Sequence, residues 1–515
     1  MVSGSDEHGT PVEVESVRQG IPPKELTDKN HAKLSKLLID WGISFDNYTR
    51  TENPVHKEFV KKTLTEVYDN GYIFTQETEM LYCEPCTRFL PDRYVEGKCP
   101  YCGYERARGD QCENCGRLLE TTSLIEPYCA ICKSKPVVRT TKHWYFDLPN
   151  LSEKIAEYLE NNHQLTSNTK NFSLGMIKEG LKPRPLTRDL SWGIQAPFPG
   201  AENKRIYVWV EAVLGYVSAT IEYFKNKGDT DRWKEYWFDP EARTYYFIGK
   251  DNIPFHTIIL PGLLLASGET YNLPWNVSAT EWLQFKGEKA SKSQKIGVYI
   301  DEALGLFPPD YWRFFLMATR PETKDSNFAW DLFRDRINAD LNDTFGNFIH
   351  RTLTFINSKF DSTIPEPKNL DASSKEMLQT LEQKLNTIWE EFDSCRLQSA
   401  VSSIVAVSRA GNQYLNEKEP WNLIKRDKEQ TGNIFYVAAQ YVKALAIASA
   451  PFIPFTAEEI WKTLNLPGSV HNQELSEATK PFLPKHKISK PAPLFKKIED
   501  TPEDLEQKLQ TARKK

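Results

Sequence analysis

The sequence lacks an apolar run long enough to cross a lipid bilayer. The best candidate, residues 255–267, falls short of the roughly 20 residues that a spanning helix needs, and Pro261 interrupts it. The first ten residues, MVSGSDEHGT, contain neither the basic nor the apolar segment of a secretion signal. Both absences disfavour a membrane or secreted protein and predict a cytoplasmic protein without a membrane partner.

A strong excess of one charge is also missing. The formal net charge is −5 over 515 residues, with 26% charged and 40% hydrophobic residues. This composition is typical of folded globular proteins and disfavours wholesale disorder. At roughly 150 residues per domain, the length predicts three or four domains. Nucleic acid remains a candidate partner, because a local basic surface is sufficient to bind it.

Cysteine is scarce outside one short segment. Eight of the nine cysteines lie between positions 83 and 132 and form four CxxC pairs, which are Cys83/Cys86, Cys99/Cys102, Cys112/Cys115 and Cys129/Cys132. Each CxxC supplies two thiolates from one turn, and four thiolates complete a tetrahedral zinc site. Disulfides are the alternative, but nothing in the sequence indicates an oxidising compartment. The segment therefore predicts structural zinc, one or two ions.

The pairing of these cysteines has two solutions. A nested arrangement places Cys99, Cys102, Cys112 and Cys115 on one ion and the outer two pairs on the other, whereas a sequential arrangement pairs neighbours along the chain. Four thiolates leave no position for a reactive water, so either arrangement predicts a structural role. The ninth cysteine, Cys395, lies in a helical region, where we expect an inert buried thiol.

Two short runs rich in β-branched and aromatic residues predict buried strands. They are residues 205–210 and 243–249, and each leads into a helical pattern, as in a parallel α/β sheet. Ligands of such sheets bind at the carboxyl ends of the strands, which directs attention to residues 209–216 and 249–256.

The chain after residue 330 is predicted to be a helical bundle. Apolar residues recur at helical spacing at Leu378, Leu381, Leu385, Ile388 and Phe392. Residues 437–449 form a second apolar helix, and residues 456–459 (TAEE) predict a capping box that opens a third. The tail beyond Lys480 is expected to be solvated.

One motif suggests the reaction. Residues 289–293 read KASKS, and two lysines three positions apart can stabilise a leaving pyrophosphate, although such strings are also common in surface loops. Three further blocks precede this string in order: GSDEHGT at 4–10, YVWVEAVLGY at 207–216 and FIGKDNIPFH at 247–256. With Ala290 in place of methionine in a KMSKS motif, the ordered set resembles the methionyl-tRNA synthetases. The four-CxxC segment is similar to that of archaeal members.

The resemblance covers essentially the whole chain and implies its architecture. A Rossmann-like, parallel-sheet α/β catalytic domain would comprise residues 1–75 and 205–275, with an insertion at 76–204 that carries zinc knuckles at 81–140. Residues 276–338 would form the KMSKS loop and a stem-contact region, residues 339–500 an all-α anticodon-binding bundle, and residues 501–515 a tail. The implied activity is activation of L-methionine by ATP with Mg²⁺, followed by transfer to elongator and initiator tRNA-Met. A monomer is expected, because no region resembles a further tRNA-binding barrel.

The same resemblance implies roles for individual residues. Asp6 would receive the methionine ammonium group, while the side-chain pocket would contain Trp209, Ala212, Tyr216, Phe255 and His256. ATP would contact Gly249, Asp251, Lys289 and Lys292, and the catalytic set would be Lys289, Ser291, Lys292, Ser293 and Arg188. The anticodon would be bound by Asn347, Arg351 and Trp421. Taken singly, each aromatic residue is better explained as a core residue and His256 as a hydrogen-bonded core histidine; their order as a set favours function.

Several features leave alternatives open. Class I synthetases carry a HIGH motif after the first strand, and no H-x-G-H occurs in this sequence. We therefore expect either a chain that has lost its first βα unit, and is inactive as given, or a catalytically dead relative that still binds tRNA. A zinc-ribbon nucleic-acid module beside an unrelated α/β domain is a further alternative. Leucyl, isoleucyl and valyl enzymes are disfavoured, because the chain has no room for their editing domain.

Overall fold

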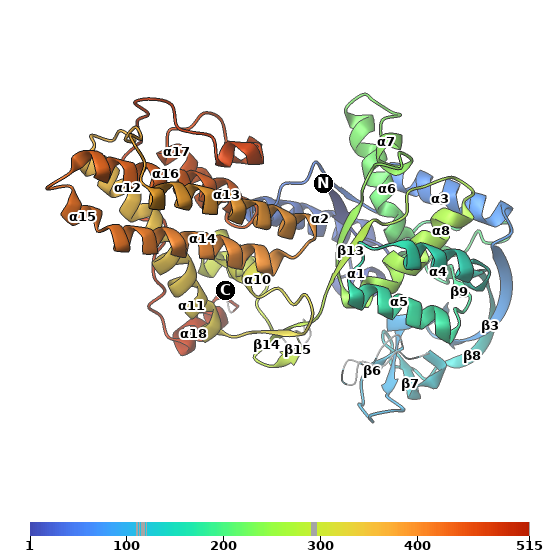
Figure 1. Ribbon diagram of the computed structural model, residues 1–515. Helices are drawn as coiled ribbons and strands as arrows, with labels where there is room; N and C mark the ends of the chain where they lie inside the picture. The colour runs from blue at the N-terminus through green and yellow to red at the C-terminus, as the bar shows by residue number, and fades with distance from the viewer. Residues whose placement is uncertain (110–111, 113, 115–118, 120, 290–295, 514–515) are drawn as a thin grey trace. The chain divides into compact units, whose positions relative to one another are not determined.

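The computed structural model describes residues 1–109, 112, 114, 119, 121–289 and 296–513 (Figure 1). The chain divides into two compact units. The first unit comprises Met1–Leu38 and Ser44–Ala279, and the second comprises Ile39–Ile43 and Thr280–Lys515. No helix within the described residues is long and apolar enough to cross a membrane.

Two pairs of strands form the framework of the first unit. β1 (Val2–Ser5) pairs in parallel with β2 (Asn47–Arg50), so that Val2 lies opposite Asn47 and Ser5 opposite Arg50. β12 (Tyr245–Gly249), the predicted strand at 243–249, neighbours β13 (Asn276–Thr280). The helices of the first unit are α1 (Thr10–Gln19), α3 (Pro54–Asp69), α4 (Ser152–Asn161), α5 (Ser167–Glu179), α6 (Val208–Asn226), α7 (Lys234–Trp237) and α8 (Leu260–Ala266). α2 (Pro23–Asp40) also begins in this unit.

The predicted strand at 205–210 is wrong. Only Arg205–Ile206 is extended, as β11, which pairs antiparallel with β10 (Thr187–Arg188), and α6 begins at Val208. The reason lies in the pattern of burial: Val210, Val213, Leu214 and Val217 are all buried and recur at helical spacing. Burial of this helical face outweighs the strand preference of valine and aromatic residues.

A long antiparallel arm carries the cysteine segment. β3 (Ile73–Cys83) pairs with β8 (Val137–Phe146), from Ile73 opposite Phe146 to Tyr82 opposite Val137. The short strands β4 (Arg88–Phe89) and β9 (Arg184–Pro185) extend this sheet, and β5 (Val95–Lys98), β6 (Ala107–Arg108) and β7 (Ile125–Cys129) form another. Figure 1 shows β6 and β7 near one end of the arm.

The second unit is mainly helical and confirms the predicted bundle. Its helices are α9 (Ile300–Leu306), α10 (Pro309–Ala318), α11 (Trp330–Arg336), α12 (Asn347–Lys359), α13 (Ala372–Asp393), α14 (Leu397–Lys418), α15 (Pro420–Leu423), α16 (Lys428–Ser449), α17 (Pro454–Thr463) and α18 (Pro502–Ala512). A small sheet contains β14 (Leu283–Phe285), β15 (Glu288–Lys289) and β16 (Ser326–Phe328). Every residue of α16 from Thr431 onward is buried, so α16 forms the centre of the bundle.

Two expectations for this unit are wrong in detail. α17 begins at Pro454, so Thr456 lies inside the helix and caps nothing; instead its backbone N–H donates to Asp310 Oδ2 over 2.7 Å. The tail is not wholly solvated either, because α18 buries Leu505 and Leu509 completely in the hydrophobic core.

A short segment from the N-terminal part of the sequence belongs to the second unit. Trp41 is 7% exposed and lies in the hydrophobic core of that unit. Its indole N–H donates to the carbonyl oxygen of Ile300 over 3.0 Å, and its own carbonyl accepts from Arg313. Gly42 follows with φ +70, in close contact with Phe455, where a side chain would not fit.

Candidate functional site

A cavity of about 370 Å³ opens at the carboxyl ends of β1, β2 and β12 in the first unit. Its remaining wall comes from α6 and from the turn that follows β12. The predicted site residues that line it are Asp6, Trp209, Ala212, Tyr216, Gly249, Phe255 and His256. Residues from three separate motifs thus meet at one place.

The loop after β1 presents Asp6 to this cavity. The next residue, Glu7, donates its backbone N–H to the Thr51 hydroxyl at the end of β2 over 3.0 Å. Gly9 has φ +89, and a Cβ there would lie 3.2 Å from Val208, so the loop needs glycine at this turn. Surrounding protein and the nearby Glu211 carboxylate raise the pKa of Asp6 to about 7, although the backbone and the charge of His8 oppose this shift.

Aromatic side chains form the opposite wall. The Trp209 and Phe255 rings are stacked with centroids 4.8 Å apart, and Tyr216 packs edge-on against Tyr246 at 5.0 Å. Trp209 is still 39% exposed, so this stack presents apolar surface to a ligand.

His256 is fixed by hydrogen bonds on both ring nitrogens. Nδ1 lies 2.9 Å from the carbonyl oxygen of Asn252, which can only accept, so Nδ1 carries the proton. Nε2 lies 2.8 Å from the Tyr216 hydroxyl. Burial lowers the pKa of His256 despite the Asn252 carbonyl, which keeps the ring neutral, and the Tyr216 hydroxyl therefore donates to Nε2.

The predicted ATP and catalytic residues are only partly brought together. Gly249 lines the cavity, and a Cβ there would meet open space. Asp251 lies in the following turn, outside the lining residues. Arg188 lies in β10 with its guanidinium carbon 3.7 Å from the centroid of the Tyr207 ring, and it does not line the cavity.

Of the KASKS residues, the described Lys289 belongs to the second unit. Lys289 ends β15 and pairs with Gln284 of β14. Ser291, Lys292 and Ser293 lie outside the described residues, so their predicted roles stay predictions.

A buried charge network beside the cavity escaped the sequence analysis. His8 Nδ1 lies 2.7 Å from Glu211 Oε1, and His8 Nε2 lies 2.7 Å from Glu52 Oε2. The His8 and Glu211 side chains are 1% and 0% exposed. These partners are 44 and 203 positions apart, so no local pattern could have indicated them.

Glu13 of α1 was missed for the same reason. One of its carboxylate oxygens accepts from the backbone N–H of Ser191 and of Trp192, over 2.7 and 2.6 Å. The other accepts from the Tyr94 hydroxyl over 2.5 Å. The Trp192 indole N–H in turn donates to the carbonyl oxygen of Glu7 over 2.7 Å. Glu13 therefore joins the cysteine segment to the loop that carries Asp6.

The structure groups the cysteines in the nested manner. The sulfur atoms of Cys83, Cys86, Cys129 and Cys132 all lie within 4.8 Å of one another. Those of Cys99, Cys102 and Cys112 form a second group, while Cys115 lies outside the described residues. Individual separations are 3.4 Å for Cys83–Cys132 and 3.6 Å for Cys102–Cys112. Bonds of about 2.3 Å to a central zinc place tetrahedral sulfurs about 3.8 Å apart, so both groups fit a metal ion. Cys395, outside both groups, is buried as predicted.

The predicted anticodon residues lie on the helical bundle. Asn347 and Arg351 are one turn apart on α12, and the Arg351 guanidinium carbon is 5.2 Å from the centroid of the Trp421 ring. Arg351 also donates to Asn416 over 3.2 Å. Trp421 is 39% exposed at the start of α15, so an aromatic face beside a cation is open to a base.

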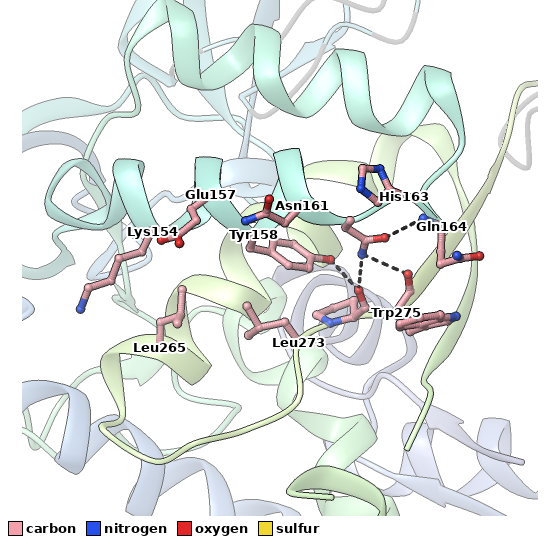
Figure 2. A pocket seen from close by; sticks show the side chains of 11 residues that line it. Lys154, Glu157, Tyr158, Asn161, His163, Gln164, Leu265, Leu273 and Trp275 are labelled. Atoms are coloured by element: carbon pink, nitrogen blue, oxygen red, sulfur yellow. Dashed lines mark hydrogen bonds between the residues drawn. The ribbon is translucent and has the colours of Figure 1, made fainter. Parts of the chain in front are cut away.

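A larger hollow of about 720 Å³ lies elsewhere in the first unit (Figure 2). It is lined by α4 and by the segment before β13, and Tyr158 and Asn162 both donate to the carbonyl oxygen of Pro274. None of the predicted site residues lines it, so the smaller cavity is the candidate site.

Known proteins resemble this chain in both units. Residues 1–353 match the family described as tRNA synthetases class I (M), and residues 364–514 match the anticodon binding domain of methionyl tRNA ligase. The methionine–tRNA ligase of Thermofilum pendens is 51% identical over 97% of this chain and 88% of its own length. That of Caldivirga maquilingensis is 52% identical over 96% of this chain and 84% of its own.

A solved structure shares the fold. Mycobacterium tuberculosis methionyl-tRNA synthetase, bound by methionyl-adenylate, superposes with a TM-score of 0.78 at 21% identity, covering 96% of this chain and 92% of that chain. This similarity confirms the predicted class: a Rossmann-like α/β domain followed by a helical anticodon domain. With both family matches and relatives of about half-identical sequence along nearly its whole length, the chain belongs to the methionyl-tRNA synthetases, a family of class I aminoacyl-tRNA synthetases.

Proposed function

We propose that the cavity at the ends of β1, β2 and β12 binds L-methionine, which the chain activates with ATP and transfers to tRNA. The family's activity is ligation of methionine to tRNA. The observation that carries the assignment of the cavity is the convergence of one carboxyl, Asp6, with a wall of aromatic side chains. An amino acid with a positive end and a thioether end complements both features.

In this proposal Asp6 binds the ammonium group of methionine through charge-assisted hydrogen bonds. The thioether lies against Trp209, Phe255 and Tyr216, because sulfur–ring contacts are favourable. The Tyr216 hydroxyl already donates to His256, so the pair forms a preorganised polar end to this wall. Ala212 leaves space that a larger side chain would fill.

The chemistry is a displacement at phosphorus. The methionine carboxylate oxygen bonds to the α-phosphorus of ATP, the bond to the bridging oxygen breaks, and pyrophosphate leaves. Mg²⁺ bound together with ATP would neutralise phosphate charge. Gly249 and Asp251 hold the nucleotide, while Arg188, Lys289, Ser291, Lys292 and Ser293 stabilise the phosphates. A hydroxyl of the terminal tRNA ribose then attacks the methionyl carbonyl, and AMP leaves.

The remaining assignments are part of the same proposal. Asn347, Arg351 and Trp421 bind the anticodon, with a base stacked on the indole. Because elongator and initiator tRNA-Met share the anticodon CAU, both are substrates. Each cysteine group holds one structural zinc through its thiolates. The enzyme is a cytoplasmic monomer.

Replacement of Asp6 tests the methionine site. Hydrogen bonds to charged groups contribute about 1.5–3 kcal/mol, so Asp6→Asn should weaken methionine binding about 10- to 100-fold by calorimetry. The matched control is Asp69→Asn, which changes an exposed carboxyl at the end of α3 outside the cavity. Methionine-dependent exchange of pyrophosphate into ATP measures activation in the same samples. If Asp6→Asn binds methionine as tightly as the control does, the assignment is wrong.

A further inference from the structure

We propose that His8 is a positioning residue for methionine binding: as an imidazolium between Glu52 and Glu211, it joins three walls of the cavity and favours the ionised form of Asp6. The inference rests on the proposed methionine site and adds a residue that touches no substrate.

His8 is positively charged between its two carboxylate partners. Each ring nitrogen lies 2.7 Å from a carboxylate oxygen, of Glu211 on one side and of Glu52 on the other. An ionised carboxylate only accepts hydrogen bonds, so both nitrogens donate and the ring is an imidazolium. Burial alone would lower the pKa of His8, but the two carboxylates raise it to about 9.

His8, Glu52 and Glu211 each lie next to, or two residues from, a side chain that lines the cavity. Asp6 lies two residues before His8, Thr51 immediately precedes Glu52, and Ala212 immediately follows Glu211; all three line the cavity. The His8 hydrogen bonds therefore join the loop after β1, the end of β2 and the first turn of α6. If the imidazole ring moved, both hydrogen bonds would break. Each of the three walls would then lose a contact that lies within two residues of a side chain lining the cavity.

The charge of His8 also acts on Asp6. Charged and titratable groups lie around His8 on four elements. They are Asp6 and Glu7 on its own loop, Arg50 at the end of β2 with Glu52 just after it, His56 and Lys57 of α3, and Glu211 of α6. Glu211 raises the pKa of Asp6, whereas the charge of His8 lowers it. Loss of the imidazolium would leave the Asp6 and Glu211 carboxylates repelling one another. Asp6 would then take up a proton in the pH range in which it must bind an ammonium group.

A double-mutant cycle tests the link between His8 and Asp6. Methionine affinity is measured by calorimetry on the full chain carrying His8→Gln, Asp6→Asn or both, with circular dichroism to establish folding. His8→Gln should weaken methionine binding about tenfold when Asp6 is present and less than twofold in the Asp6→Asn background. Equal losses in both backgrounds would mean that His8 acts only on general stability, which overturns the inference.

A second variant decides the matter even if His8→Gln fails to fold. Glu52→Gln keeps the hydrogen-bonding shape at a side chain that is 13% exposed but removes one of the charges that hold the proton on His8. The methionine affinity of Glu52→Gln should fall as the pH rises from 7 to 8.5, whereas that of the unmodified chain should rise about twofold over that range as Asp6 ionises. Parallel pH profiles for the two proteins would contradict the inference.

The outcomes also separate this inference from the proposed function. An unmodified chain that binds no methionine would overturn both. Methionine binding that is lost in Asp6→Asn but unchanged in His8→Gln would leave the proposed site intact and overturn the role of His8.

Discussion

At the scale of single residues, the site depends on Asp6, a carboxyl whose ionisation is unfavourable in its surroundings. Asp6 faces a cavity, and its neighbour Glu211 is a fully buried carboxyl whose pKa burial raises. Because the pKa of Asp6 is raised, its ionisation above pH 7 opposes folding. A bound ammonium group offsets that repulsion, so the free site favours a ligand that brings a positive charge.

This raised pKa gives a pH dependence with a definite sign. Only the carboxylate form of Asp6 binds an ammonium ion, so methionine affinity should fall as the pH falls through 7. From pH 8 to pH 6 the ionised fraction falls about tenfold, and the association constant measured by calorimetry should fall by the same factor. Asp6→Asn is the control and should show a flat profile; a slope that survives in Asp6→Asn would assign the titration to another group.

At the scale of elements, local pattern and distant packing determine different parts of the structure. The helix at 372–393 and the strand at 245–249 were predictable, because one follows the apolar period of a helix and the other is a short β-branched and aromatic run. The run at 205–210 has the composition of a strand, yet the buried residues of α6, which begins within it, recur at helical spacing. In the site, motif order indicated the lining residues Asp6, Trp209 and His256. The contacts of His8 with Glu52 and Glu211 join residues that are distant in the sequence, so no local spacing could predict them.

The cysteine segment supplies a prediction at this scale. Cys83→Ser removes one thiolate from the group at the end of the β3–β8 arm, so metal analysis should find that group's zinc lost and the other retained. Because Tyr94 contacts Glu13, hydrogen exchange should also increase at α1. The matched control is Cys395→Ser, which changes a buried cysteine outside both groups and should keep all bound zinc. Full zinc content in Cys83→Ser would contradict the grouping.

At the scale of the whole molecule, the two units have separate hydrophobic cores but an interleaved sequence. Residues 39–43 belong to the second unit, although residues on both sides belong to the first. Trp41 is the large apolar side chain of this segment and is almost fully buried. The stability of the second unit therefore depends on a residue encoded in the N-terminal tenth of the chain.

Trp41→Ala should accordingly destabilise the second unit and leave the methionine site unchanged. Removal of a buried tryptophan costs about 3–5 kcal/mol through lost contacts and the cavity that remains. In calorimetric unfolding, added methionine identifies the transition of the first unit by raising its temperature, and the substitution should lower the other transition. Leu34→Ala, at a partly exposed position of α2 in the first unit, is the control. If Trp41→Ala instead lowers the temperature of the methionine-dependent transition, the assignment of Trp41 to the second unit is wrong.

The interleaving also has a consequence for synthesis of the chain on the ribosome. Residues 39–43 emerge early, whereas their partners, which begin at residue 280, emerge only after the first unit has been made. Until then Trp41 has no core to enter and remains an apolar side chain in contact with water or with whatever binds nascent chains. A ribosome that stalls after the first unit has emerged, but before the second unit is made, would hold a folded first unit with this tryptophan exposed. Quality control could distinguish unfinished chains from finished ones by this feature.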